Sequence, residues 1–445
     1  MRVRRLRPPK MGIDWLSNRL QRFPSIWKLA VQLYEFSRFE PHKQKYVKRS
    51  SYNFQEPEYM KYQIVFDAQC LQTRTRDRGI GIYSQNLILS ICKKRPEQRF
   101  AAILTTLGTD ADLKKAVGLL EDLHCSNLDI LIVDLFLENS ETTFIRARKN
   151  IQSYLEKIGC CAIVSLSPFE KHDSVVSFPS SSTYKEIGVL YDLIPLQYPG
   201  DFLFSRYRKS SYLWSLRNLS TYKLLLAISA ETKNHWNRMC DSKMNVEVVR
   251  GGGYVGQLQL GNGFHGRNGI LCVSAELPHK NLAKLIESYS LLPKGIQLEH
   301  PLIIVGIKSL GAKRKLIKFS KEAFGRIIFT EYIDKVEMLE KYRSARLLVM
   351  PSIIEGLSLP ILEAWSNGLV AVGSKGTVAE ELINSTILLF DPFDSTEIAN
   401  CMRLLLTSET CWNEALKVSM LSAANLTWDT TAVLALNAIE SLFDE

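Results

Sequence analysis

Two successive series of short apolar runs, separated by segments of helical pattern, constrain the fold of this chain more than any other feature. The first series occupies residues 62–67, 100–104, 128–133, 162–165, 187–191 and 224–228. The second series occupies residues 269–274, 301–305, 327–329, 347–350, 370–372 and 387–390. Strands that alternate with helices form parallel sheets joined by helical crossovers. The sequence therefore predicts an α/β protein with two doubly wound, Rossmann-like domains.

The length of 445 residues supports this division, because it exceeds what one compact core usually holds. Glycines 251–253 and the polar, glycine-rich segment 261–269 have the composition of a linker. Two domains laid end to end place a ligand in the cleft between them, at the carboxyl ends of both sheets. We expect four parts: an N-terminal extension at 1–61, a Rossmann-like domain at 62–255, a second Rossmann-like domain at 256–425 and a final helix at 426–445.

The net charge of +10 is concentrated near the N-terminus, where residues 1–61 hold 14 Lys/Arg against 5 Asp/Glu. Charges interrupt every apolar stretch there, so the segment does not have the pattern of a signal peptide. Trp15 and Trp27 lie among apolar residues that basic residues interrupt, which favours a basic helical arm on an anionic membrane surface. A helix packed on the body is an equally open interpretation. Without a recognisable motif, nucleic-acid binding has little support, and no nucleic-acid partner is expected.

Hydropathy and cysteine usage indicate the compartment. No apolar run reaches the roughly 18 residues that a membrane-spanning helix needs. The nine cysteines are scattered and odd in number, which suits neither a disulfide framework nor a zinc site. We therefore expect a soluble, cytoplasmic protein, with peripheral attachment to the inner face of the membrane as an extension of that expectation.

Residues 347–368 form the segment richest in candidate site residues. The apolar run predicts a buried strand, Gly356 permits a turn, and Pro360 suits the first turn of a helix, where its missing N–H costs nothing. The free backbone N–H groups of Leu357, Ser358 and Leu359 would then face a ligand phosphate. Glu355 and Glu363 flank this helix start. In the plainer interpretation Glu363 only complements the helix dipole and Glu355 is a solvated loop residue.

This segment resembles the signature P-S-x-x-E-G-x-G-L-P-x-x-E-A of the retaining nucleotide-sugar glycosyltransferases of family 4, also called glycosyl transferases group 1. Ser358 stands where a second glycine is usual. The resemblance implies the GT-B architecture, with an acceptor domain at 62–255, a nucleotide-sugar domain at 256–425 and a terminal helix that crosses back to the first domain. It also implies that Glu363 binds the ribose hydroxyls, that Glu355 holds the transferred sugar, and that no metal or cofactor is needed beyond a GDP- or UDP-linked donor.

The segment around Lys280 resembles the family's strand and loop ending in K-N. By this resemblance Lys280 binds the donor phosphates and acts in catalysis with Glu355. Many members carry an arginine five positions earlier, where this chain has Ala275. A protonated His279 could compensate for that missing charge. A lone histidine is more often structural, and a surface lysine at a helix start is the plainer interpretation of Lys280.

In the first half, residues 189–199 resemble the H-D-L-I-P-L-x-x-P stretch of mannosyltransferase-like members. Tyr191 replaces the histidine that reaches the donor sugar, and Asp192 follows it. A phenol keeps hydrogen bonding but removes acid–base chemistry near neutral pH. Gly79 and Gly81 would let the first-domain loop approach the diphosphate, unless they only permit close packing of helix and strand. Ser229 reads as a helix N-cap.

The sequence thus favours a glycosyltransferase that moves a hexose from a nucleotide-diphosphate sugar to a lipid-linked or polysaccharide acceptor, as in lipopolysaccharide assembly. The resemblance leans toward mannose. Tyr191 and Ala275 keep open a non-catalytic GT-B partner or scaffold in a glycan assembly complex. A nucleotide-sugar epimerase or hydrolase on the same fold is a further alternative, although no base candidate other than His279 lies near the motif.

Overall fold

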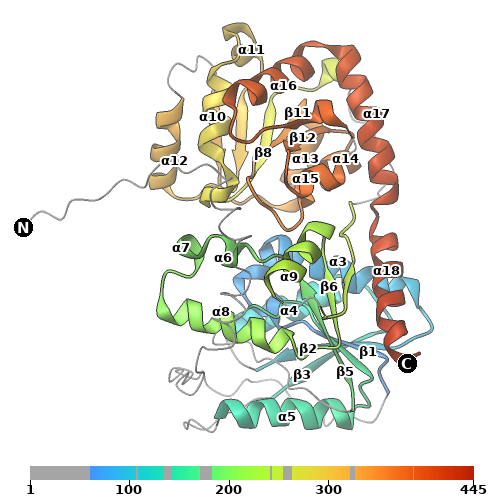
Figure 1. Ribbon diagram of the computed structural model, residues 1–445. Helices are drawn as coiled ribbons and strands as arrows, with labels where there is room; N and C mark the ends of the chain where they lie inside the picture. Colours follow the sequence, from blue (N-terminus) through green and yellow to red (C-terminus); the bar gives the residue numbers. More distant parts are fainter. Residues whose placement is uncertain are drawn as a thin grey trace, which may run out of the picture.

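The computed structural model describes residues 61–106, 109–134, 143–170, 183–240, 243–253, 263–320, 326–383 and 385–444. The arm expected at residues 1–61 lies outside the described residues, apart from Lys61. Two stacked domains make up the described part of the chain (Figure 1).

The first domain contains a seven-stranded sheet in which every pair of neighbouring strands is parallel. The strand order is β3-β2-β1-β4-β5-β6-β7, so the winding reverses between β1 and β4. The strands are β1 (Ile64–Asp67), β2 (Phe100–Thr105), β3 (Leu128–Val133), β4 (Ala162–Ser165), β5 (Lys185–Leu190), β6 (Leu224–Ala227) and β7 (Val246–Val248).

The second domain repeats this winding with six parallel strands in the order β10-β9-β8-β11-β12-β13. Its direction reverses between β8 and β11. The strands are β8 (Ile270–Val273), β9 (Leu302–Val305), β10 (Ile327–Thr330), β11 (Leu347–Met350), β12 (Val370–Ser374) and β13 (Leu389–Phe390). The prediction of an α/β chain with two doubly wound domains is confirmed. The one strand that was not predicted is β7. Only Val246 of its three residues is buried, so no apolar run in the sequence indicates this strand.

Helices cover both sheets (Figure 1). Those of the first domain are α3 (Gly79–Lys94), α4 (Asp110–Glu121), α5 (Thr143–Lys157), α6 (Ile194–Gln197), α7 (Pro199–Phe202), α8 (Arg206–Leu219) and α9 (Ala230–Met239). Those that follow are α10 (Leu282–Ser290), α11 (Lys294–Glu299), α12 (Leu310–Leu316), α13 (Lys335–Ser344), α14 (Leu359–Ser366), α15 (Val378–Leu382), α16 (Ser395–Thr407), α17 (Glu409–Asn425) and α18 (Trp428–Glu440). Short 3-10 helices include η2 (Gln69–Gln72), η3 (Arg74–Asp77), η5 (Pro278–Lys280) and η6 (Ile317–Phe319).

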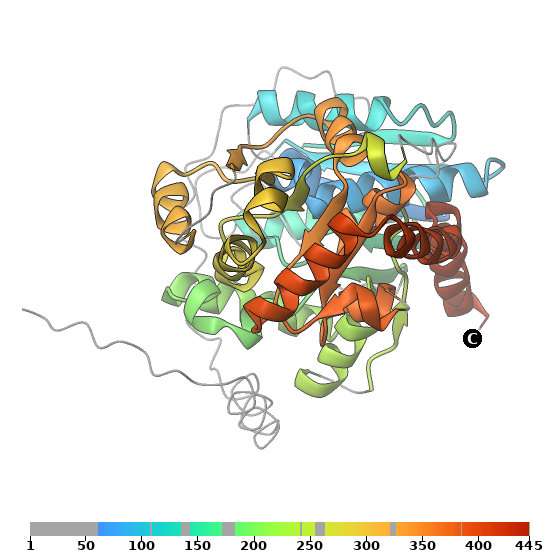
Figure 2. The ribbon, with the colours of Figure 1, turned by 90° about the horizontal axis from the view of Figure 1, so that it is seen from above.

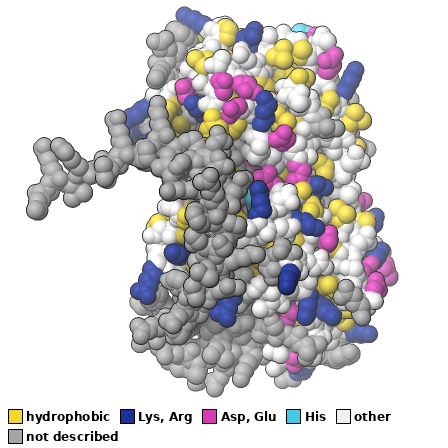
Figure 3. Space-filling view, in the orientation of Figure 1, with side chains coloured by type: hydrophobic (Ala, Val, Ile, Leu, Met, Phe, Trp, Pro, Cys, Tyr) yellow, Lys and Arg dark blue, Asp and Glu magenta, His cyan; other side chains and the backbone are white. Residues whose placement is uncertain are grey.

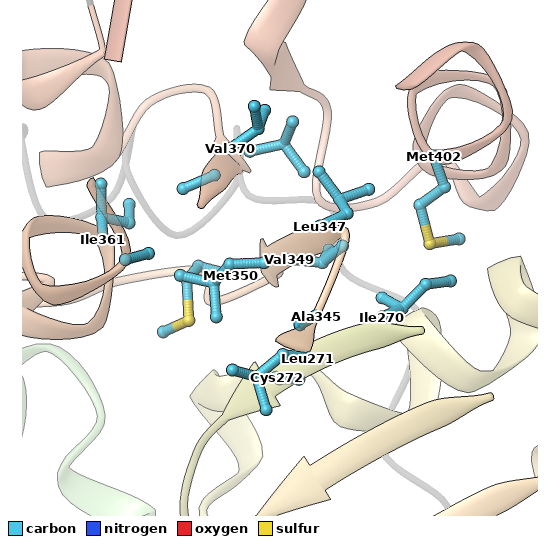
Figure 4. Packing of buried hydrophobic residues seen from close by; sticks show 14 of the residues in the cluster. Ile270, Leu271, Cys272, Ala345, Leu347, Val349, Met350, Ile361, Val370 and Met402 are labelled. Atoms are coloured by element: carbon cyan, nitrogen blue, oxygen red, sulfur yellow. The ribbon is translucent and has the colours of Figure 1, made fainter. Parts of the chain in front are cut away.

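The strands read as nearly continuous apolar runs because helices bury them on both faces. In β1, Ile64 and Phe66 join the core that includes α3 and α18, whereas Val65 joins the core under α5. In the second domain, Ile361 of α14 and Met402 of α16 pack near β11 from opposite sides (Figure 4).

The chain crosses between the domains at two neighbouring points. Gly253 and Thr427 form an isolated parallel bridge, and a Cβ on Gly252 would lie 2.2 Å from the backbone nitrogen of Trp428. After this second crossing α18 packs against α3, and its apolar side chains complete the first-domain core; these are Ala432, Ala435, Leu436 and Ile439. The glycine run predicted as a linker is therefore a close contact between the two crossing segments.

Candidate active site

The segment between β11 and α14 has the strand, loop and helix order that the sequence predicts. β11 ends at Met350, and α14 begins at Leu359 with Pro360 in its first turn. Ser358 is the N-cap residue, but its side chain makes no capping hydrogen bond. The Ser358 side chain therefore leaves the backbone N–H groups of this first turn uncapped. Uncapped N–H groups at a helix start can bind an anion.

Glu355 lies immediately before this helix and is paired with Lys280. The Lys280 Nζ donates to Glu355 Oε1 at 2.8 Å, and the Ser352 hydroxyl donates to the same oxygen at 2.6 Å. Only 5% of the Glu355 side chain is exposed, against 22% for Lys280. Burial opposes ionisation of Glu355, but the charge of Lys280 and the hydrogen bonds from Lys280 and Ser352 outweigh it and hold the carboxyl pKa below its ordinary value. The two residues expected to be catalytic thus form one ionised pair.

Two further predicted residues lie around this pair. Asp192 of the first domain accepts a hydrogen bond from the Ile194 backbone N–H at 2.9 Å, and burial raises its pKa while the nearby charge of Lys280 opposes the rise. His279 is 5% exposed, and its ring lies 5.6 Å from the ring of Phe202 in α7. Burial and the adjacent Lys280 lower the pKa of His279 to about 4, so the imidazole is neutral near pH 7. A neutral imidazole favours the plainer interpretation, in which His279 is structural.

Glu363 lies on α14, in contact with a residue that sequence reasoning missed. The Tyr342 hydroxyl, on α13, donates to Glu363 Oε2 at 2.6 Å. Burial raises the pKa of Glu363. The Tyr342 hydroxyl occupies Oε2, which leaves Oε1 as the carboxylate oxygen to accept a ligand hydroxyl. Tyr332, which is 65% exposed, lies within electrostatic reach of Glu363 and of Arg78 at the start of α3.

The two predicted glycines have different surroundings. A Cβ on Gly79 would lie 3.7 Å from Leu359 Cδ1, so the N-termini of α3 and α14 face each other across the domain junction. A Cβ on Gly81 would instead lie 2.3 Å from the Arg76 carbonyl oxygen, within the first domain. Gly81 thus permits close packing of α3 on η3, which is the plainer of its two interpretations, and only Gly79 faces the second domain.

Tyr191 does not direct its phenol toward the Lys280 pair. Its hydroxyl lies 3.1 Å from the Ser84 hydroxyl and donates to the Ile80 carbonyl at 3.4 Å, and its ring packs edge-on against Tyr83. Burial raises its pKa well above the ordinary value. The phenol therefore lies in the first-domain core, whereas a donor-binding role was expected for it. Sequence reasoning missed this because Ser84 is 107 positions away.

The backbone carbonyl of Tyr191, unlike its side chain, lies against the second domain next to Glu355. A Cβ on Gly356 would lie 2.0 Å from the Tyr191 carbonyl oxygen, so only glycine permits this approach of the two domains. The Thr232 hydroxyl donates to the same carbonyl at 3.2 Å and lies 3.5 Å from the Gly356 carbonyl. Gly356, predicted as a turn residue, is therefore also a point of interdomain contact, next to Glu355. Ser229 caps α9, as predicted.

A second contact that sequence reasoning missed joins the domains through Glu381 of α15. Its carboxylate accepts hydrogen bonds from the backbone N–H groups of Ala230, at 3.1 Å, and Glu231, at 3.2 Å, at the start of α9. Arg250 Nε donates to it at 2.5 Å. An acidic side chain of one domain thus caps a helix N-terminus of the other, where the helix dipole favours negative charge. No local motif could have indicated it, because the partners are separated by about 150 positions.

Replacement of Glu381 by glutamine is expected to loosen the domain contact by about 1 kcal/mol, because it removes the charge from the helix N-terminus and from Arg250. The radius of gyration from small-angle X-ray scattering should rise. Glu380→Gln is the matched control, since Glu380 accepts from Gly376 at 2.7 Å within its own domain. Equal scattering curves for both variants and the unmodified protein would show that Glu381 does not hold the domains together.

Comparison with known proteins agrees with this geometry. Residues 261–419 match the family model described as Glycosyl transferases group 1. The chain contains a group 1 glycosyltransferase domain. Residues of the Lys280 pair, Gly356 and Glu363 all lie within this group 1 domain, whereas Asp192, Gly79 and the carbonyl of Tyr191 approach it from the first domain.

Curated relatives are similar to this chain beyond the matched domain. It is 24% identical over 410 residues to the serotype-specific mannosyltransferase WbdA of Escherichia coli, covering 85% of this chain and 48% of the relative. It is 30% identical over 168 residues to the O-antigen chain mannosyltransferase B of Escherichia coli, covering 37% of this chain and 44% of the relative. The chain spans about half the length of these relatives.

Solved structures share the fold of this chain. A sucrose-phosphate synthase from Thermosynechococcus elongatus superposes with a TM-score of 0.60 at 13% identity, covering 86% of this chain and 99% of that one. HepE from Anabaena, in complex with UDP and glucose, gives a TM-score of 0.59 at 15% identity, covering 86% of this chain and all of that one. These similarities confirm the expected GT-B fold. In the part of the chain that the structure describes, no helix is both long and apolar enough to cross a membrane.

Proposed function

We propose that this chain is a retaining, metal-independent glycosyltransferase of family 4. In this proposal it transfers a hexose, with mannose favoured, from a GDP- or UDP-linked sugar to a lipid-linked or polysaccharide acceptor at the cytoplasmic face of a membrane. The observation that carries the proposal is the 2.8 Å ion pair between Lys280 and the buried Glu355, next to the N-terminus of α14. The mannosyltransferase relatives support the choice of mannose.

The geometry suits a diphosphate leaving group. Lys280 and the facing N-termini of α14 and α3 supply positive electrostatic potential without a metal. When a donor binds, its phosphate would share the Lys280 ammonium with Glu355, and Glu355 would accept hydrogen bonds from the sugar hydroxyls. Glu363 Oε1 is suitably placed to accept hydrogen bonds from the ribose.

The reaction exchanges one bond for another at the anomeric carbon. The bond to the diphosphate oxygen breaks, the bond to the acceptor oxygen forms on the same face, and the acceptor proton moves to the departing phosphate oxygen. Because the substrate supplies its own base, the protein needs mainly to stabilise charge on the leaving group. This fits a site in which His279 is neutral and Glu355 and Glu363 have binding roles.

A donor should stabilise the protein in a thermal-shift measurement. GDP-mannose, UDP-glucose, UDP-galactose, UDP-GlcNAc, GDP and UDP form the test set. A nucleotide at 100 times its dissociation constant is expected to add about 2.7 kcal/mol to the free energy of unfolding. Glu363→Ala should reduce this gain through loss of the ribose contact.

The matched control is Glu340→Ala, which removes an exposed glutamate from neighbouring α13. It should leave the nucleotide response unchanged. If no nucleotide stabilises the protein, the result would favour the alternative of a non-catalytic GT-B partner. The buried phenol of Tyr191 and the absence of an arginine at Ala275 are the two features of the chain that agree with that alternative.

A further inference from the structure

The segment from Ile307 to Ser320, which includes α12 and η6, is unusually basic for its length. It contains five Lys/Arg and no Asp/Glu. Ala312 and Leu316 pack on the second-domain core and anchor the segment. Three large apolar side chains instead face outward: Leu310 is 69% exposed, Ile317 is 44% exposed and Phe319 is 45% exposed. The segment thus presents apolar and basic groups together on its outer surface.

The turn between α7 and α8 in the first domain has the same character. Phe204 is 66% exposed, and the guanidinium carbon of Arg208 lies 4.6 Å from the centre of its ring. Arg206 and Lys209 are exposed beside it, and no acidic residue lies between Phe202 and Lys209.

Contacts across the domain junction connect the two segments. The Phe202 ring lies 5.6 Å from the His279 ring, and the Glu276 carboxylate accepts a hydrogen bond from the Ser309 backbone N–H at the start of α12. Leu277, which is 41% exposed, lies between these contacts in the sequence. Both views of the ribbon place α12 and α8 on the same side of the molecule (Figures 1 and 2). A few Lys and Arg side chains of each domain are visible on that side of the space-filling view (Figure 3).

We propose that this surface binds an anionic lipid bilayer. We call it the basic apolar face, and it consists of Phe204, Arg206, Arg208 and Lys209 of the first domain with Leu310, Arg314, Lys315, Ile317, Lys318 and Phe319 of the second. Basic residues that surround exposed aromatic and aliphatic side chains suit the anionic headgroup region, where the charges meet phosphate and the apolar groups enter the acyl boundary. An acidic polymer would use the charges but would leave the apolar groups in water.

The basic apolar face has a consequence for the acceptor, and this step rests on the proposed function. His279 belongs both to the junction that connects the two segments and to the surroundings of Lys280. Lipid binding through this face would therefore bring the domain junction to the bilayer surface. A lipid-linked acceptor could then present its sugar to the site while its hydrocarbon chain remains in the membrane.

The test uses the full chain with vesicles of phosphatidylcholine, with and without phosphatidylglycerol. The triple variant Arg314→Ser, Lys315→Ser, Lys318→Ser is expected to bind anionic vesicles at least about tenfold more weakly, because each basic residue near the surface adds to the attraction. The control variant Lys93→Ser, Lys94→Ser, Lys114→Ser removes the same charge from α3 and α4 and should bind as the unmodified protein does. Equal binding by the two triple variants would overturn the proposal.

Two further measurements test which surface binds the vesicles and what kind of partner it binds. The first distinguishes the basic apolar face from the basic arm at 1–61, and the second distinguishes a bilayer from an acidic polymer. Hydrogen exchange should slow at residues 204–209 and 310–319 when the protein is on anionic vesicles, and unchanged exchange there would overturn the proposal. Leu310→Ser with Phe319→Ser should also weaken vesicle binding, and undiminished binding would contradict insertion of the apolar groups. The nucleotide thermal shift of each variant is a separate readout, so loss of vesicle binding with an intact nucleotide response cannot be mistaken for failure of the donor site.

Discussion

Lys280→Ala is expected to lower kcat for sugar transfer by about 100- to 1000-fold, the usual effect of removing one group that stabilises charge in a transition state. The loss should be in kcat and kcat/KM together, because the charge on the departing phosphate is largest in the transition state. Initial rates measured over a range of donor concentrations separate the two parameters. A rise in KM with unchanged kcat would show that Lys280 contributes only to ground-state binding.

The same substitution should also lower the free energy of unfolding, by about 2 kcal/mol, since it leaves the buried Glu355 carboxylate without its partner. This is less than for a fully buried pair, because 22% of the Lys280 side chain is exposed. The pairing lowers the pKa of Glu355 in the folded protein, so its contribution is present above the ordinary glutamate pKa and is lost as pH falls through the lower folded value. The difference between variant and unmodified protein in urea unfolding should therefore shrink below about pH 4.

Lys284→Ala is the matched control for Lys280→Ala. Lys284 lies one turn further along, on α10, and pairs with Glu287 at 3.0 Å on the helix surface. Its removal should leave kcat unchanged and alter stability by less than about 0.5 kcal/mol. Glu355→Gln combined with Lys280→Met should recover most of the lost stability without recovering activity, which distinguishes the structural role of the pair from its chemical one.

Gly356→Ala is expected to reduce kcat/KM by about 100-fold, although alanine adds only one methyl group. Its Cβ would lie 2.0 Å from the Tyr191 carbonyl oxygen and 3.0 Å from Asp192 Cβ, so the domains would have to move apart. A displacement of about 1 Å in an active site can cost this much. Scattering should show a larger radius of gyration, and far-UV circular dichroism should show an unchanged fold within each domain.

Gly118→Ala provides the control for a glycine replacement. Gly118 lies in α4 with no atom within 4 Å of the added methyl group, so the change should raise the unfolding free energy by about 0.5–1 kcal/mol and leave activity intact. Full activity of Gly356→Ala would mean that the close approach of Gly356 to Tyr191 is not needed during turnover.

The strands could be predicted because burial on both faces leaves a signal in the sequence itself. All four residues of β1 and all six of β2 are buried, and each reads as an apolar run. The loop and helix start around Glu355 could be predicted for a similar reason, since Gly356 and Pro360 have local conformational effects. β7 lacks such a signal, because Val246 is its only buried residue.

The remaining features of the site depend on contacts between distant parts of the chain. Nothing local to Tyr191 indicates that Ser84 and Tyr83 hold its phenol inside the first domain. Likewise, Glu381 reads as an ordinary helix-surface residue until α9 is brought against it. The pairing of Lys280 with Glu355 was also not predicted, because each residue was assigned a separate ligand group and the 75 positions between them conceal their proximity.

The packing of α18 against α3 determines the order in which the chain can finish folding during synthesis. The ribosome releases the first domain long before Trp428–Glu440, yet those residues supply Ala432, Leu436 and Ile439 to the first-domain core. Until they emerge, apolar side chains of α3 remain open to water and to other nascent chains. The first domain, although translated before the second, is therefore completed after it, and a stop codon just before α18 would damage the first domain.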